Sequence, residues 1–371
     1  MRLLIGGDVC PANVSDLFEK GDVEALFGDV PEAFYAADRV LINFECSMTE
    51  SNVKIKKIGP NLKATPKCAE VLRKAGVTDA ALSNNHIFDY GVRGVLDTIS
   101  VLEKVGIRHT GLGKDYEDAR KNLIMEAGDK TVSVINVCEH EYCYALEDRM
   151  GARPFDPLDT IEDIRDAKTK SDFVIVLYHG GKEQCEYPSP RLVKMCRAMV
   201  KNGADVVLCQ HSHCIGGYEM WGGGHILYGQ GNFYFCNHPS QTSVKWNTGL
   251  LVELEITDEI KIDFLPVESV TNPFGIRFAS GEIKEEIMKR FAFLTKSLVD
   301  GTYKKGWHDF CEEQLGYRKC IEDADGGDMD IYAEKYTPNE RFSHYLFCEA
   351  HQDVLREIFK LPWEKRDLDV K

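Results

Sequence analysis

The chain's most informative segment is Val206-Val207-Leu208-Cys209-Gln210-His211-Ser212-His213. An apolar run without alternation is typical of a parallel strand that is buried on both faces. Residues two apart in an extended strand exit point to the same side, so both imidazoles should leave the sheet together. Open α/β sheets bind ligands at this end of their strands, and two imidazoles supply half of a metal site. The alternative is a polar loop that contains two histidines by chance.

Four other apolar segments also end in polar residues. They are 3–7 followed by Asp8, 40–42 followed by Asn43 and Glu45, 79–82 followed by Asn84, Asn85, His86 and Asp89, and 173–177 followed by His179. The carboxyl ends of parallel strands joined by right-handed crossovers share one edge of the sheet. We therefore expect these side chains to meet in space.

The polar residues at these ends have the chemistry of a two-metal site. Two carboxylates, an amide oxygen and three imidazoles are enough for two divalent ions about 4 Å apart. Such donors suit Mn, Fe or Zn, and a bound cation makes water a nucleophile at neutral pH. Each residue also has an ordinary alternative: Asp8 as a turn or helix cap, His179 as a hydrogen-bonded loop residue, Asn84 and Asn85 as turn residues, Glu45 as a solvated charge. Recurrence at five strand ends favours a site.

Helical patterns lie between the predicted strands. Thr65 as N-cap, Pro66 at the first position and Gly76 after the last turn predict one helix, and 92–102 and 190–202 predict two more. Segment 15–27 is weakly helical. The charged segment 139–171 contains Pro154 and Pro157 and is predicted to run over the surface. From about residue 280 only helical periodicity remains.

Composition is that of an ordinary soluble protein, with 371 residues, 43% of them hydrophobic. The net charge of −15 disfavours nucleic acid and anionic membranes as partners. No run of about 18 apolar residues could span a membrane, and the short apolar N-terminus is not a signal peptide. The 13 cysteines form no Cys-x-x-Cys pair and lie mostly in apolar runs, which indicates a reducing compartment. We therefore expect a cytoplasmic protein.

Six motifs occur in an order that resembles a known family. They are Gly7-Asp8, Asn43-Phe44-Glu45, Ser83-Asn84-Asn85-His86-Ile87-Phe88-Asp89-Tyr90-Gly91, His179-Gly180-Gly181, Gln210-His211-Ser212-His213 and Gly231-Asn232-Phe233. The order is similar to that of the poly-γ-glutamate capsule synthesis (CapA) family, which is related to calcineurin-like metallophosphoesterases. The resemblance implies an α/β fold, a four-layer αββα sandwich over 1–270, with a helical C-terminal extension, 271–371, packed on it.

The resemblance also implies a role for each site residue. Asp8 and His213 would ligate the first metal, Glu45 would bridge, and the second metal would take Asn85, His179 and His211. His86 would protonate the leaving oxygen or stabilise the transition state, oriented by Asp89. The sequence departs from the phosphoesterase pattern at Cys10, which replaces a histidine, and at Glu45, which replaces an aspartate. The first metal site is then weak, filled only with substrate, or ligated by Cys10, whose thiolate would favour zinc.

These observations predict a metal-dependent hydrolase of a phosphoester or related bond, with two divalent ions and an anionic small-molecule or polymer substrate. One alternative is a non-catalytic, metal-containing binding component of a γ-glutamyl polymer or cell-envelope polysaccharide pathway. Another is a fold that has lost its site and uses its helical tail in assembly. Specificity is expected from 46–64, 139–171, 232–248 and the tail. The acidic stretch 323–328 resembles a calcium loop only loosely, because the closing glutamate is missing. The oligomeric state is left open.

Overall fold

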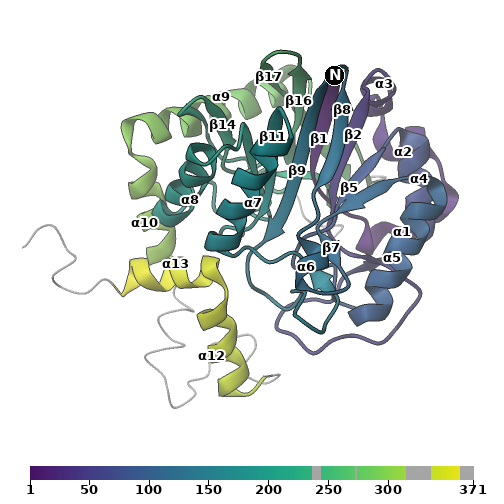
Figure 1. Ribbon diagram of the computed structural model, residues 1–371, viewed down its shortest axis with the longest axis horizontal. Helices are drawn as coiled ribbons and strands as arrows, with labels where there is room; N and C mark the ends of the chain where they lie inside the picture. Colours follow the sequence, from purple (N-terminus) through teal and green to yellow (C-terminus); the bar gives the residue numbers. More distant parts are fainter. Residues whose placement is uncertain (236–243, 272–273, 315–335, 360–371) are drawn as a thin grey trace, which may run out of the picture.

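The computed structural model describes residues 1–235, 244–271, 274–314 and 336–359, and two β-sheets form its centre (Figure 1). The larger sheet has the order β18-β17-β16-β1-β2-β5-β6, with β15 beside β1. Its strands are β1 (Arg2–Cys10), β2 (Arg39–Phe44), β5 (Asp79–Ala81), β6 (Arg108–Thr110), β15 (Asn232–Phe235), β16 (Thr248–Ile256), β17 (Ile260–Thr271) and β18 (Phe274–Phe278). The strands β1, β2, β5 and β6 are parallel, and β16 to β18 continue antiparallel from β1.

The smaller sheet has the order β13-β14-β12-β11-β9-β8. Its strands are β8 (Leu123–Ala127), β9 (Lys130–Cys138), β11 (Phe173–His179), β12 (Val206–Gln210), β13 (Tyr218–Trp221) and β14 (Gly224–Leu227). The four central strands are parallel, with an antiparallel strand at each edge. Two short ribbons complete the strands: β3 (Ser47–Met48) with β4 (Lys63–Ala64), and β7 (Leu112–Gly113) with β10 (Gly151–Ala152).

Helices cover the outer face of each sheet. Those of the larger sheet are α1 (Ser15–Lys20), α2 (Val23–Phe27), α3 (Val30–Tyr35), α4 (Lys67–Ala75) and α5 (Gly91–Val105). Those of the smaller sheet are α7 (Pro157–Lys170) and α8 (Pro190–Lys201). The remaining helices are α6 (Tyr116–Ala119), α9 (Gly281–Asp300), α10 (Tyr303–Glu312), α12 (Pro338–Phe347) and α13 (Glu349–Ile358), besides a 3-10 turn at Ala12–Val14.

Alternate residues of the central strands belong to different hydrophobic layers. In β1, Leu3 and Ile5 pack between the sheets, whereas Leu4 packs against the helices of the larger sheet. In β11, Ile175 packs between the sheets and Val174 packs against α7 and α8. Both faces of each central strand are therefore buried, which explains the continuous apolar runs in the sequence. Three hydrophobic layers separate four structural layers, and the predicted αββα sandwich is confirmed.

The prediction that 139–171 is a surface excursion is wrong. The segment contains β10 and the 14-residue helix α7, whose N-cap Asp156 accepts hydrogen bonds from the backbone of the first turn. Pro157 occupies the first position of this helix, where proline needs no hydrogen-bond acceptor, so it starts a helix instead of breaking one. Arg153 is buried beneath the helix and forms an ion pair with Asp163.

Two smaller predictions also differ from the structure. The weak helix expected over 15–27 is two helices, because Gly21 ends α1 in a left-handed conformation with φ of 69°. The helix expected to begin at Pro66 has Pro66 as its N-cap and begins at Lys67. Helices 91–105 and 190–201 follow the predictions closely.

The C-terminal part is helical, as predicted, but the larger sheet extends further along the chain. Strand β18 lies beyond residue 270, and α9 begins at Gly281. The division into domains 1–270 and 271–371 stays a prediction. The calcium-like stretch 323–328 lies outside the described residues. Among the described helices, none combines the length and the apolar character that crossing a membrane requires.

Candidate metal centre

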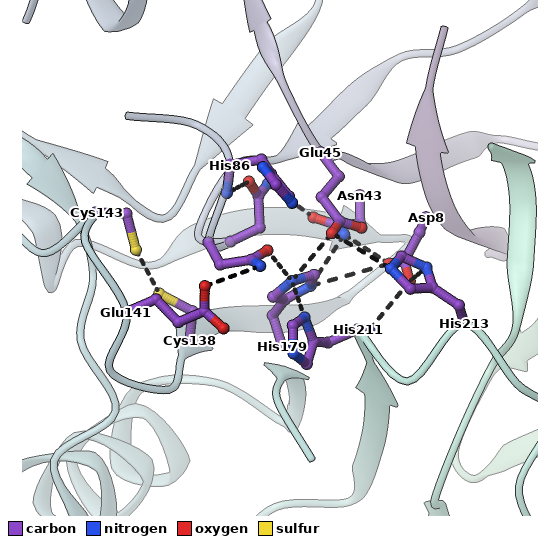
Figure 2. A network of polar contacts seen from close by, with 12 residues as sticks. Asp8, Asn43, Glu45, His86, Cys138, Glu141, Cys143, His179, His211 and His213 are labelled. Atoms are coloured by element: carbon purple, nitrogen blue, oxygen red, sulfur yellow. Dashed lines mark hydrogen bonds and ion pairs between the residues drawn. The ribbon is translucent and has the colours of Figure 1, made fainter. Parts of the chain in front are cut away.

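The strand ends of both sheets meet at one place, as the sequence predicts (Figure 2). Asp8 lies on β1, Glu45 follows β2, Asn85 follows β5, His179 ends β11, and the two remaining histidines follow β12. All six predicted ligands are buried, with no more than 5% of any residue exposed. The residues are Asp8, Glu45, Asn85, His179, His211 and His213.

Two groups of donor atoms share one carboxylate. Glu45, His179 and His211 form one group, and Asp8, Glu45 and His213 form the other, with the donor atoms of each group within 4.8 Å of one another. A carboxylate common to two neighbouring groups is the arrangement that holds a pair of divalent ions in two-metal sites. The described residues therefore contain buried clusters that could bind metal.

Asp8 is held as a carboxylate by its neighbours. Its Oδ1 accepts a hydrogen bond from Asn43 Nδ2 at 2.7 Å, and its Oδ2 accepts one from the backbone N–H of His211 at 3.0 Å. Burial opposes ionisation, but the hydrogen bond and charge of His213 and the charge of His179 lower the pKa of Asp8 to about 2. Asp8 is thus ionised at neutral pH, which is the state that ligates a cation.

The surroundings of Glu45 disfavour its ionised form, whereas those of Asp8 favour the carboxylate. It is fully buried, and neither of its carboxylate oxygens has a hydrogen-bond partner. Burial, followed by the nearby charge of Asp8, raises its pKa well above the ordinary value. A buried carboxylate without donors is costly, because desolvation is not offset by hydrogen bonds. Two divalent cations would offset this cost, so the residues present fit a metal pair.

His179 lies next to the other residues of the second donor group. Its Nε2 lies 3.0 Å from Asn85 Oδ1, 3.2 Å from His211 Nδ1 and 3.6 Å from Glu45 Oε1. Burial and the proximity of His211 lower the pKa of His179 well below its ordinary value. Burial also lowers the pKa of His211. Both imidazoles are therefore neutral at pH 7, which is the form that ligates metal ions.

His211 and His213 converge on the centre, but not because the chain is extended there. Strand β12 ends at Gln210, and the φ angles of His211 and His213 are 85° and 55°. Left-handed conformations are uncommon for residues with a Cβ and cluster at functional sites. The expected i, i+2 extended geometry is wrong, and a strained turn places the two rings.

Asn232 orients the His213 ring. Its Oδ1 lies 2.8 Å from His213 Nδ1, and its Nδ2 donates to the backbone carbonyl of Trp246. The Trp246 and Phe235 rings pack against the same imidazole, with ring centroids 4.6 and 4.5 Å away. The Gly231-Asn232-Phe233 motif indicated that this segment mattered, but only the structure gives Asn232 this positioning role.

Cys10 lies outside both donor groups. The bulge in β1 between Asp8 and Val9 turns Cys10 into the hydrophobic layer beneath the helices of the larger sheet, where its thiol interacts with that of Cys46. The hypothesis that Cys10 serves as a soft ligand therefore finds no support in the geometry.

His86 and Asp89 form a pair beside the centre, together with a lysine that the sequence did not single out. His86 Nδ1 lies 2.7 Å from Asp89 Oδ2, and Lys57 Nζ lies 2.5 Å from Asp89 Oδ1 and 3.2 Å from His86 Nδ1. Burial and the positive charge of Lys57 lower the pKa of His86. The contact with Asp89 occupies Nδ1, so Nε2 is the nitrogen left for a substrate.

Three acidic or amide residues near the centre were not among the predicted site residues. Asn43 donates to Asp8, and Glu141 Oε2 accepts from Asn85 Nδ2 at 3.2 Å. Burial opposes ionisation of Glu183, but the charges of Lys182, His211 and His213 lower its pKa to about 2. The strand-end pattern flagged Asn43. Glu141 and Glu183 lie in loops without a recognisable motif.

A cavity of about 240 Å³ lies over the centre and contains His86 and His211 in its wall. Lys57 and Lys182 supply positive charge there, and the junction of α12 and α13 closes the opposite side with Cys348 and His351. We refer to α12 and α13 as the C-terminal roof; both lie at the lower left of Figure 1. The site is thus assembled from the sandwich and from the helical tail.

Comparison with known proteins finds a matching family and several relatives of this chain. Residues 2–237 match the model of the bacterial capsule synthesis protein PGA_cap family. The PGA biosynthesis protein CapA of Bacillus subtilis is 30% identical over 226 residues, which are 60% of each chain. The capsule biosynthesis protein CapA of Bacillus anthracis is 26% identical over 330 residues, 86% of this chain and 78% of that one. A hypothetical protein from Thermus thermophilus has a solved structure that is 15% identical, with a TM-score of 0.45, and covers 72% of this chain and 98% of its own.

The chain spans about 60% of the length of the Bacillus subtilis relative. The matched segment, residues 2–237, is well over half of the present chain and includes all six predicted ligands together with His86 and Asp89. The chain belongs to the bacterial capsule synthesis protein PGA_cap family.

Proposed function

We propose that the protein is a metal-dependent hydrolase of a phosphoester or a related bond, with His86 as proton donor. The observation that carries the proposal is the shared carboxylate: Glu45 belongs to both donor groups and has no hydrogen-bond donor of its own. When bound, a pair of Mn, Fe or Zn ions supplies Lewis-acid polarisation of the substrate and activation of water. Asp8, Glu45 and His213 would hold one ion, and Glu45, Asn85, His179 and His211 the other.

The chain's own residues have distinct tasks in this scheme. Asp89 accepts the Nδ1 proton of His86, which fixes the tautomer and directs Nε2 towards the cavity. Protonated His86 then delivers a proton to the leaving oxygen. Lys57 and Lys182 line the cavity and favour an anionic substrate in a protein whose net charge is −15. The roof limits the access of bulk water.

A second candidate function is a non-catalytic, metal-containing component that binds a γ-glutamyl polymer. The two Bacillus relatives are named PGA and capsule biosynthesis proteins, which favours this pathway. The carboxylates of such a polymer would meet the same cations and lysines as a phosphate would. A cavity of about 240 Å³ suits the end of a chain or a small molecule better than a continuous strand.

We also propose a cytoplasmic location. The described cysteines are all buried and form no disulfide bond. Cys196 and Cys209 are among them, although their sulfur atoms lie 3.6 Å apart. Close thiols that stay reduced are typical of a reducing compartment.

The deciding experiment is an assay of the purified full chain with Mn²⁺ on aryl phosphate mono- and diesters, in parallel with binding of oligo-γ-glutamate. Hydrolysis that disappears with a chelator, and with His86→Gln at unchanged metal content, is the expected result. Bound metal with tight oligo-γ-glutamate binding and no turnover on any ester would select the second candidate. A chain without bound metal under all conditions would contradict both.

A further inference from the structure

A separate group of metal-binding side chains lies where the roof meets the sandwich. Glu141, Cys348 and His351 present a carboxylate oxygen, a sulfur and an imidazole nitrogen that all lie within 4.8 Å of one another. Glu141 follows β9, whereas the other two residues stand at the start of α13. None of the three belongs to the donor groups around Glu45.

We propose that this group binds a zinc ion that fastens the C-terminal roof to the sandwich. Thiolate, imidazole and carboxylate together are zinc ligands, whereas Mg and Mn prefer sites made of oxygen. Zinc bonds of about 2.0–2.3 Å place tetrahedral ligand atoms roughly 3.3–3.8 Å apart. Donor atoms within 4.8 Å reach that spacing by small side-chain adjustments.

The start of α13 places the two proposed ligands Cys348 and His351 close to each other. Cys348 is the residue between α12 and α13 and is the N-cap of α13, and only 3% of it is exposed. The dipole of α13 favours a thiolate at this position, but without an ion burial and the charges of Glu141 and Glu139 raise the pKa of the Cys348 thiol well above its ordinary value. The thiolate would therefore form as the cation binds and displaces the thiol proton. His351 lies three residues later, in the first turn of α13. Burial and the nearby charge of Lys182 keep the pKa of His351 well below its ordinary value, so the imidazole is neutral.

The third ligand and the helix are held by one buried network. Asp353 of α13 accepts hydrogen bonds from Ser189 Oγ at 2.5 Å and from Arg191 Nε at 2.8 Å. The same Arg191 forms an ion pair with Glu139, two residues before Glu141. Glu141 itself is held by Asn85, and it lies at the edge of the network in Figure 2. Both sides of the cluster are therefore fixed relative to each other before any ion binds.

The remaining coordination position faces the cavity over the centre. Glu141, Cys348 and His351 line the same 240 Å³ cavity as His86 and His211. Three protein ligands with one open position are typical of zinc sites that accept a further ligand. The ion would add a positive charge opposite the centre and would contact an anionic group of a bound ligand. The thiol proton of Cys348 leaves to solvent as zinc binds. The inference does not depend on whether the centre hydrolyses any bond.

The test is Co²⁺ titration of the full chain, followed by absorption spectroscopy and metal analysis. Cobalt–thiolate ligation gives a charge-transfer band in the near-ultraviolet that oxygen and nitrogen ligands do not give. We expect this band in the wild-type protein and its loss in Cys348→Ser, with one fewer equivalent of zinc per chain. The matched control is Cys143→Ser, a buried cysteine near the same loop that is outside the cluster, and it should retain the band.

Other variants separate this site from the centre. His211→Ala removes a ligand of the centre and should leave the thiolate band unchanged. His351→Gln should weaken zinc binding by at least tenfold while the metal content of the centre is retained, and it serves if Cys348→Ser fails to fold. A wild-type spectrum without a thiolate band, or a band that persists in Cys348→Ser, would overturn the proposal.

Discussion

The candidate metal centre and the C-terminal roof line one cavity but are built differently. The centre consists of side chains at strand ends, and its contacts pass between neighbouring strands such as β1 and β2 or β11 and β12. The roof is held by contacts between residues far apart in sequence, such as Asp353 with Arg191 and Glu349 with His140. The centre is therefore recognisable in the sequence, whereas the contacts that hold the roof follow no local sequence pattern.

The largest effect is expected when a ligand of the centre is removed. His211→Ala takes away an imidazole that lies beside His179 and Glu45. We expect the variant to lose one equivalent of metal. Its activity should fall by more than the roughly 10–100-fold that follows from changing a residue that only hydrogen-bonds to a ligand. Metal analysis and the esterase assay measure both. The control His225→Ala changes another buried histidine, in β14, and should change neither.

Removal of His86, the proposed proton donor, should lower activity without changing metal binding. We expect His86→Gln to lower kcat by roughly 10²–10⁴-fold, the usual contribution of general acid catalysis. Metal content should stay at the wild-type value, because His86 belongs to neither donor group. His109→Gln, at a partly buried histidine on β6, is the matched control. Loss of metal in His86→Gln would show that His86 is a ligand.

A variant of Asn232 tests whether a residue that hydrogen-bonds to a proposed ligand, without ligating the metal itself, affects metal affinity. Asn232→Ala removes the acceptor 2.8 Å from His213 Nδ1. We expect metal affinity to fall by about 10–100-fold, with less loss of kcat at saturating metal. Calorimetric titration with Mn²⁺ measures the affinity, and Asn202→Ala at the end of α8 serves as control. An unchanged affinity would mean that Trp246 and Phe235 alone orient the ring.

Lys57 should control the pH dependence. Its charge lowers the pKa of His86, together with burial, so Lys57→Met should raise that pKa. A general acid works only while protonated, and activity falls as pH rises through its pKa. The alkaline limb of kcat should therefore move to higher pH in Lys57→Met. Lys56→Met removes the neighbouring, exposed lysine that pairs with Glu340 and should leave the limb in place. A shift to lower pH would contradict the assignment.

The smallest effect is expected at the rim of the roof. Glu349→Gln weakens an ion pair with His140 whose histidine side chain is 46% exposed. Such pairs contribute about 0–1 kcal/mol, so we expect a change in KM of about fivefold or less and an unchanged metal content. Steady-state kinetics at fixed Mn²⁺ would measure it. A large fall in kcat would show that the roof takes part in the chemistry.

The sequence predicted the layers and the members of the centre for one physical reason. Parallel strands buried on both faces give continuous apolar runs, and proposed ligands such as Asp8 and His179 lie at the ends of those runs. It did not predict the left-handed turn at His211 and His213, because nothing in a local pattern marks a conformation imposed by the fold. The resemblance to the CapA family implied a role for each residue, and these roles stay predictions.

The roof and α7 could not be predicted in the same way. Pro157 is favourable at the start of a helix and unfavourable inside one, and only the N-cap bonds of Asp156 show which case applies. The pairing of Asp353 with Arg191 and Ser189 depends on tertiary packing, which produces no periodic pattern in the sequence. Glu141 and Lys57 reach the cavity from loops, where chain direction is not encoded by hydrophobic pattern.

The central claim is that Glu45 stands between two metal ions. A crystal structure of the Mn²⁺-loaded full chain, with anomalous diffraction measured at the manganese edge, tests it most directly. The account predicts two anomalous peaks about 4 Å apart, one on each side of the Glu45 carboxylate. A single peak away from Glu45, or no peak among Asp8, His179 and His213, would contradict it.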